Sequence, residues 1–172
     1  MNVKVTWKDA GFNALQFELS KLGMMAARVG ILGSEAERTH PLRNDLSVGD
    51  VGLMNELGSA RAGVPRRSFL LSTLRQKRAE VAKALIVVAR SVIFSKVQPT
   101  RALAILGRAF VPYVVEKILS GSISPRNAPM TVELKGHGQT LQDTMTLSHS
   151  ISSDVALNDG STGINTANEG ID

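Results

Sequence analysis

A bend between two unlike halves of the chain constrains the fold more than any other feature. Residues 55–70 read Asn-Glu-Leu-Gly-Ser, a small flexible stretch at 60–63, and then Val-Pro-Arg-Arg-Ser-Phe-Leu. Gly58 is placed to end a helix, because glycine accepts the left-handed conformation of a helix C-cap. Pro65 has a fixed φ that suits a first helical turn, and Phe69 is one of only five Phe, which suits a buried anchor. By itself this pattern predicts a helix, a loop and a helix, as in many α-rich domains.

The amino-acid content indicates a globular protein with an aliphatic core. Of 172 residues, 43% are hydrophobic and only 4% are aromatic, and a chain of this length can bury a sizeable core. There is no Cys, which excludes a disulfide framework, a cysteine nucleophile and a thiolate metal site. The first seven residues contain no apolar run of the kind that forms a signal peptide. No run is long enough for a membrane span, so we predict no membrane partner.

Hydrophobic spacing before the bend predicts strands and helices in alternation. Period two indicates a half-buried strand, and steps of three and four indicate an amphipathic helix. The predicted elements are a strand at 3–7, a helix from about 11 to 23, a strand at 27–32, a long exposed loop at 33–46 and a short helix capped by Ser47.

After the bend the chain is more helical and more apolar. The spacing predicts one long helix over about 67–96 and a second over 101–120. Residues 84–94 are nearly all apolar, and such a helix must be buried in the core or against another subunit. The last predicted elements are a loop at 122–130, a short helix within 140–149 and a strand at 151–157.

These elements together predict an α+β fold, with a small antiparallel sheet flanked by helices that include two long apolar ones. We expect a single domain over residues 1–157. Residues 158–172 are mostly Gly, Ser, Asn and Asp, a composition that cannot form a packed core by itself. We therefore expect an extended or disordered C-terminal tail.

The distribution of charge says more than the net charge of +5. Residues 61–101 contain ten Lys or Arg and one acid, whereas residues 140–172 contain five acids and no Lys or Arg. Opposite charge at two ends suits head-to-tail packing of identical subunits. The alternatives are a solvated basic helix with an acidic tail, or a DNA-binding protein that uses 61–101. Sequence-specific DNA binding is disfavoured, because the stretch lacks interleaved aromatics and a recognised reading motif.

No pattern of residues indicates bond chemistry. The three His are His40, His137 and His149, and none has a metal-ligand spacing with another His or a pair of carboxylates. Ser148 and His149 are neighbours on a predicted helix and so point in different directions. No glycine-rich phosphate-binding motif occurs. We predict no enzymatic activity, no cofactor and no metal.

Three segments, in order, resemble the neck and tail-completion proteins of tailed bacteriophages, a set that includes the virion morphogenesis proteins of Mu-like phages. In the first segment that family reads Asn-Glu-aromatic-Gly-Thr, then Ile-Pro-x-Arg-x-Phe. The matching residues here are Asn55, Glu56, Gly58, Pro65, Arg67 and Phe69. Leu57, Ser59 and Val64 replace the aromatic residue, the Thr and the Ile.

The second and third segments lie toward the C-terminus. The second runs from Ile118 to Gly121 and then through Asn127-Ala128-Pro129 to Lys135-Gly136-His137. The third, at 141–151, is similar to the family's Leu-x-Asp-Thr-Gly-x-Leu-x-x-Ser-Ile, with Met145 in place of the Gly. Its matching residues include Asp143, Thr144, Leu147, Ser150 and Ile151.

The resemblance covers about residues 27–155 and implies a structural role. Such a protein forms a homo-oligomeric ring, six-fold or twelve-fold, in the virion neck or tail after assembly in the host cytoplasm. Its expected neighbours are phage connector, stopper, tail-terminator or tail-tube proteins, with genomic DNA passing nearby without sequence-specific contacts. The matching residues are expected to be structural or interface residues. From the first segment we also hypothesise an ion pair between Glu56 and Arg67.

Overall fold

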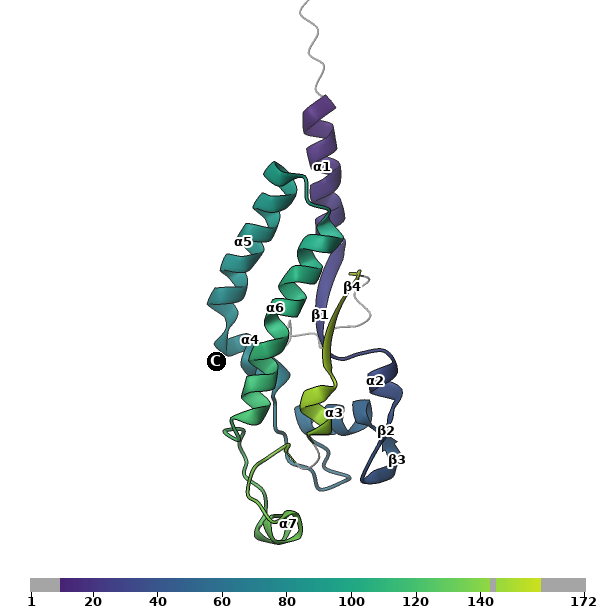
Figure 1. Ribbon diagram of the computed structural model, residues 1–172, viewed down its shortest axis with the longest axis vertical. Coiled ribbons are helices and arrows are strands. Elements are labelled where there is room, and N and C mark those ends of the chain that lie inside the picture. The colour runs from purple at the N-terminus through teal and green to yellow at the C-terminus, as the bar shows by residue number, and fades with distance from the viewer. Residues whose placement is uncertain (1–9, 143–144, 159–172) are drawn as a thin grey trace, which may run out of the picture.

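The computed structural model describes residues 10–142 and 145–158, and within them the fold is α+β (Figure 1). The helices are α1 (Ala10–Gly23), α2 (Ser34–Glu37), α3 (Val48–Leu57), α4 (Leu70–Gln76), α5 (Arg78–Ser95), α6 (Pro99–Leu119), α7 (Pro129–Lys135) and α8 (Thr146–His149). The strands are β1 (Met25–Ile31), β2 (Thr39–His40), β3 (Arg43–Ser47) and β4 (Ile151–Leu157). The predicted strand at 3–7 and the predicted tail after Asn158 lie outside the described residues.

An antiparallel pair of strands joins the two ends of the described chain. β1 pairs with β4 in a register that runs from Met25 opposite Leu157 to Ile31 opposite Ile151. The small antiparallel sheet and both strand predictions, at 27–32 and 151–157, are thereby confirmed. β2 and β3 form a separate two-stranded hairpin.

Helix α6 packs along the β1–β4 sheet and forms the centre of the fold (Figure 1). A Cβ added at Gly107 would lie 3.1 Å from the Ser153 Cβ, so glycine at this position allows the helix to approach β4 closely. The two ends of α6 reach two groups of buried side chains. One is Phe69, Val114, Ile118, Ile123, Leu147 and Ile151. The other is Val88, Val92, Ala102 and Leu103.

The predicted helix over 67–96 is wrong as a single element. It is divided into α4 and α5 at Lys77, whose φ of −99° and ψ of 13° are not helical. Pro65 does not begin a helix either, because α4 starts five residues later at Leu70. Local spacing could not show this, since apolar positions on both sides of Lys77 keep nearly the same helical phase.

The segment 33–46 is not the continuous loop that we predicted. It contains α2 and most of the β2–β3 hairpin, whose turn includes Pro41, a residue common in tight turns. The segment expected as a loop at 122–130 likewise runs into α7, which has Pro129 in its first turn. Short elements of this kind carry too few residues for a clear period.

The predicted cap of α3 is confirmed. Ser47 Oγ accepts a hydrogen bond from the Asp50 backbone N–H at 3.0 Å, and the Asp50 carboxylate accepts one from the Ser47 N–H at 3.0 Å. This reciprocal pair is a capping box and satisfies donors that a helix N-terminus leaves free. The hydrogen bond from the Ser47 side chain holds the pKa of Asp50 below its ordinary value.

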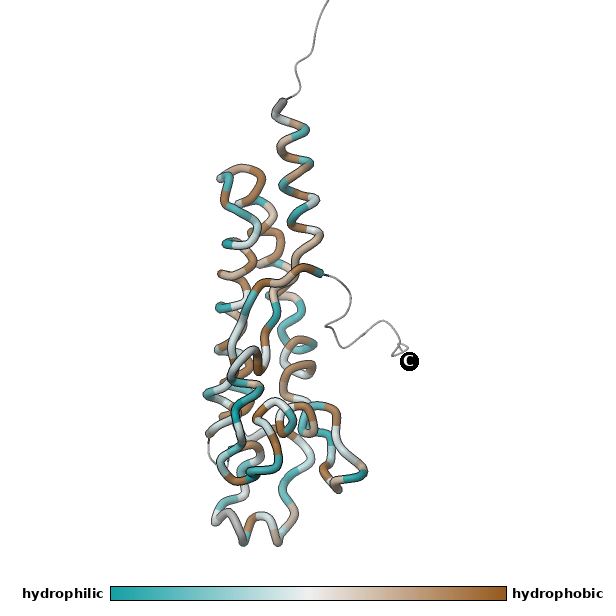
Figure 2. Tube along the Cα trace, turned by 90° about the vertical axis from the view of Figure 1, so that its right-hand side faces the viewer, coloured by the Kyte–Doolittle hydropathy of each residue, from teal (hydrophilic) through white to brown (hydrophobic). Residues whose placement is uncertain are grey.

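The two long helices are present, but the expectation that they are apolar is wrong. α5 has 18 residues and buries only Val88 and Val92, while Ile86, Val87 and Phe94 are exposed. α6 has 21 residues and also has an exposed side that carries Arg101 and other polar residues. Hydrophobic and hydrophilic residues alternate along the helices (Figure 2). None of the helices in the described part of the chain is long and apolar enough to cross a membrane.

We predict that the ion pair across the sheet makes stability depend on pH. Arg28 donates to both carboxylate oxygens of Asp154, at 2.8 and 2.6 Å, and these hydrogen bonds lower the pKa of Asp154. Because the folded pKa is below the unfolded one, the stabilisation is complete above the unfolded pKa and is lost as the pH falls through the folded pKa. In urea unfolding, wild type should exceed Asp154→Asn in stability at pH 7, and the difference should shrink at pH 3. An equal difference at both pH values would contradict this assignment.

Candidate functional site

A buried carboxylate holds the bend at residues 55–70. Glu56, in the last turn of α3, is only 2% exposed and accepts four hydrogen bonds. The donors are Ser68 Oγ at 2.6 Å and the backbone N–H groups of Phe69, Leu70 and Leu71 at 2.7, 2.8 and 3.0 Å. The three backbone donors are at the start of α4, where N–H groups have no partner in their own helix and negative charge is favoured. One side chain of α3 therefore caps α4 and fixes the angle of the bend.

The loop between these helices is closed by backbone contacts. Ser59 and Val64 exchange two hydrogen bonds, of 2.8 and 2.9 Å, and the Arg67 N–H donates to the Asn55 carbonyl at 2.6 Å. Gly58 has a φ of +80°, as expected for glycine after a helix, but its ψ of 161° is not that of a left-handed cap. A Cβ there would lie 3.0 Å from the Arg66 nitrogen, which is a second reason for glycine.

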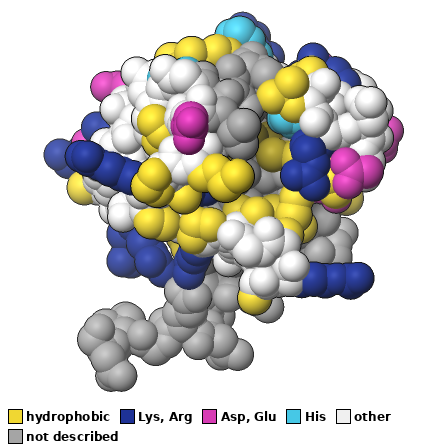
Figure 3. Space-filling view, turned by 90° about the horizontal axis from the view of Figure 1, so that it is seen from below, with side chains coloured by type: hydrophobic (Ala, Val, Ile, Leu, Met, Phe, Trp, Pro, Cys, Tyr) yellow, Lys and Arg dark blue, Asp and Glu magenta, His cyan; other side chains and the backbone are white. Residues whose placement is uncertain are grey.

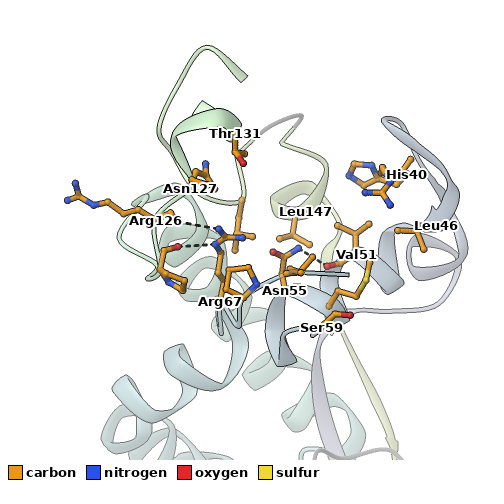
Figure 4. Close-up of a pocket in the computed structure, with 18 of the residues that line it drawn as sticks. His40, Leu46, Val51, Asn55, Ser59, Arg67, Arg126, Asn127, Thr131 and Leu147 are labelled. Carbon is orange, nitrogen blue, oxygen red and sulfur yellow. Dashed lines mark hydrogen bonds between the residues drawn. The ribbon is translucent and has the colours of Figure 1, made fainter. Parts of the chain in front are cut away.

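The hypothesised ion pair between Glu56 and Arg67 is wrong. The four donors of the bend already occupy the Glu56 carboxylate. The Arg67 side chain instead extends toward the backbone near Arg126 (Figure 4). Its Nε donates to the Pro125 carbonyl at 3.0 Å and its Nη2 to the Arg126 carbonyl at 3.4 Å. Partial burial lowers the pKa of Arg67. No carboxylate of the described residues is paired with this guanidinium.

The third predicted segment meets the first in the protein core. Leu147 and Ile151 pack in the same buried cluster as Phe69, which is 1% exposed. Ser150 is also buried, and its Oγ donates to the Thr146 carbonyl at 2.8 Å and accepts from Arg38 at 2.9 Å. Asp143 and Thr144 lie outside the described residues.

The second segment joins the same corner through polar contacts. Arg67 holds the carbonyls of residues 125 and 126, and the Asn127 side chain donates to the Gln139 carbonyl at 2.9 Å. Gln142, which our prediction omitted, donates to the carbonyls of Ile118 and Leu119 at 2.9 and 2.8 Å. It thereby satisfies acceptors that the end of α6 leaves free. The Gln142 amide contacts carbonyls more than twenty residues earlier in the chain. A contact at that separation has no periodic pattern in the sequence that could have predicted it.

These contacts leave an open groove of about 910 Å³ at the end of the molecule that carries α7 (Figures 3 and 4). Its apolar lining includes Leu46, Val51, Met54, Val64, Leu141 and Leu147. Its polar lining includes His40, Arg43, Asn55, Arg67, Arg126 and Asn127. Seen from this end, hydrophobic side chains gather in the middle with Lys and Arg on both sides (Figure 3). We call this feature the groove. Our prediction named four residues of its lining as site residues, Asn55, Pro65, Arg67 and Leu147, but not His40 or Arg43.

The groove has the chemistry of a binding site for an apolar group that carries negative charge. An apolar group could pack against the apolar side chains of its floor, and Arg67 supplies a partly buried cation. Of the three His, His40 lines the groove, His149 is exposed, and His137 has an enclosed Nδ1 with no hydrogen-bond partner among the described residues. Within the described ranges, no three His, Asp or Glu side chains gather as metal ligands would.

Comparisons of the chain with protein-family models, with curated proteins and with solved structures give no match. The likeness to phage neck and tail-completion proteins rests on three sequence segments alone, and the family assignment stays a prediction.

Proposed function

We propose that this protein is a structural subunit of the head–tail junction of a tailed bacteriophage. Copies of the chain form a ring that joins the tail to the capsid connector and lets DNA pass. The observation that carries this proposal is an exposed apolar stripe on α5, formed by Ile86, Val87 and Phe94. These side chains are 55%, 64% and 78% exposed. Two turns of a helix are about seven residues, so Phe94 lies above Val87 and beside Ile86 on one side of α5.

Self-association would remove this stripe from water. Burying one large aliphatic or aromatic side chain contributes about 1.5–3 kcal/mol, so a contact over the stripe offers a substantial driving force. Helix α1 projects at the top of the molecule (Figure 1) and also carries exposed aromatic side chains. Its Phe12 and Phe17 are 59% and 60% exposed. Exposed apolar side chains on two different helices of one subunit suit the heterologous contact from which rings are built.

We predict that acidic substitutions in the stripe abolish self-association. In sedimentation velocity, wild type should form a multi-subunit species, whereas the double variant Ile86→Asp, Phe94→Asp should be monomeric. Met130→Asp is the matched control, because Met130 is 73% exposed on α7 and outside the stripe. A wild-type chain that remains monomeric at every accessible concentration would refute the ring. So would a double variant that assembles as wild type does.

The runner-up function is DNA binding by the basic stretch at 61–101. Lys83 and Arg90 are exposed on the same side of α5 as the stripe, and these two cations favour DNA binding. However, Arg67 is turned toward backbone carbonyls and Lys77 pairs with Glu80, so part of the positive charge is engaged within the chain. Filter binding at low and high salt separates the two functions, because phosphate contacts weaken steeply with salt. Tight, salt-sensitive binding by the isolated wild-type subunit would favour DNA binding.

A further inference from the structure

We propose that the groove binds the acidic segment 159–172 of a neighbouring copy of the chain. This inference rests on the self-association in the proposed function, and it names a second contact between subunits that is separate from the α5 stripe.

The first argument is the state of Arg67 in the groove. Its guanidinium has five N–H groups, and two are used by the carbonyls of residues 125 and 126. Burial disfavours its charge, as the direction of its pKa shows. A cation held at a partly buried position without a carboxylate is stabilised by an incoming anion, and Arg forms strong paired contacts with carboxylates.

The second argument is the arrangement of charge around the apolar floor. His40 lies at one side of the groove, and residue 126 lies at the other, with its side chain extending outward from the rim (Figure 4). Arg43, the partner of His40 in the β2–β3 hairpin, is also part of the lining. Among the described residues, the carboxylate paired with Arg43 is that of Asp45, at a long distance of 3.5 Å, and the Arg43 side chain is 60% exposed. An occupant with acids on both sides of an apolar side chain would therefore match the groove.

The segment 159–172 has this composition. It contains Asp159, Glu169 and Asp172, no Lys or Arg, and the apolar residues Ile164 and Ile171. Its last four residues read Glu-Gly-Ile-Asp, which places a carboxylate before and after an isoleucine. Its carboxylates supply the negative charge that the lining of the groove, which includes no Asp or Glu among the described residues, does not have.

The direction of β4 points to a neighbouring copy as the source. β4 begins at Ile151, just after α8, whose Leu147 lines the groove. It ends at Leu157, opposite Met25, after a rise of about 23 Å for seven residues. The acidic segment therefore starts at the end of the sheet away from its own groove. In a head-to-tail arrangement this end lies near the groove of the next subunit.

The test measures binding of a fluorescein-labelled peptide with the sequence of residues 159–172. The protein is the full-length chain with Glu169→Gln, Ile171→Ser and Asp172→Asn, so that its own segment does not compete. Fluorescence anisotropy should show saturable binding. Adding Arg43→Glu and Arg126→Glu should weaken it about tenfold or more. Arg101→Glu with Arg108→Glu, an equal change of charge at exposed positions of α6 outside the groove, should not. A peptide with the same three substitutions should bind about tenfold more weakly.

Two results would overturn the groove as the site: no peptide binding, or binding that the rim substitutions leave unchanged. If either occurs while wild type still self-associates, the proposed ring stands and only this inference fails. A monomeric wild-type chain instead overturns the ring and, with it, the neighbouring copy as the source of the segment.

A cross-linking arm identifies which copy supplies the segment. The chain has no Cys, so single cysteines can be placed by Gly170→Cys in one preparation and Asn127→Cys in another. Mixing and mild oxidation should give disulfide-linked heterodimers. The chain with both substitutions should link to other copies; if it forms only an internal bridge, the segment occupies its own groove and the proposal is wrong.

Discussion

Glu56→Ala is expected to lower the free energy of unfolding by about 3–5 kcal/mol. The substitution removes the acceptor of four hydrogen bonds, three of them from the first backbone N–H groups of α4. With Glu56 only 2% exposed, water cannot easily replace the carboxylate, and buried donors left without a partner are costly. Urea unfolding monitored by circular dichroism measures the loss of free energy. In thermal unfolding we expect a drop in Tm of roughly 10 °C.

Two further variants show that the effect comes from the carboxylate. Glu56→Gln keeps the size of the side chain but directs an amide NH₂ at N–H donors, so it should also destabilise, though less than alanine. Glu116→Ala removes an exposed carboxylate from α6 and should change stability by no more than about 0.5 kcal/mol. If Glu56→Ala were as mild as Glu116→Ala, the capping of α4 by Glu56 would not be important for the fold.

The second large effect is expected from Phe69→Ala, at about 3–5 kcal/mol. Phe69 is 1% exposed and packs with Leu147 and Ile151 in a cluster that joins the bend to β4. Its truncation removes apolar contacts and leaves a cavity that the surrounding helices can fill only in part. Thermal unfolding of the purified variant measures the loss.

Phe94→Ala is the matched control for Phe69→Ala. It deletes the same atoms from a side chain that is 78% exposed, so in a dilute, monomeric sample it should alter stability by less than about 0.5 kcal/mol. A Phe69→Ala variant with the melting temperature of wild type would show that Phe69 is not the anchor of the bend.

Features of the fold that depend on local sequence were predictable. The apolar period of α1, the alternation in β1 and the Ser47–Asp50 pair lie within short stretches, and each produced the expected element. The burial of Phe69 was also expected, because a rare aromatic residue beside a tight corner has few alternatives to the core.

Features that depend on contacts between distant residues were not predictable. Arg67 binds carbonyls 58 and 59 residues away, and nothing local distinguishes that partner from the nearby Glu56. The apolar run in α5 was expected to be buried, but only one side of the helix contacts the rest of the chain. An apolar run indicates that a helix seeks a partner, and it does not say whether that partner is in the same subunit.

The groove was predictable only in part. Asn55, Pro65, Arg67 and Leu147 were chosen from two separated segments, and the structure places all four along its wall. His40 and Arg43 come from a hairpin that we expected to be a long exposed loop. Their part in the site depends on how the hairpin folds against α3, which residue spacing does not encode.

The proposed role at the head–tail junction is tested most directly by electron microscopy of phage particles made without this protein. The account predicts DNA-filled heads without attached tails, or unfinished tails, and recovery of joined particles when wild type is supplied. The double variant Ile86→Asp, Phe94→Asp should fail to restore joining, while Met130→Asp should succeed. Normal, joined particles in the absence of the protein would contradict the account.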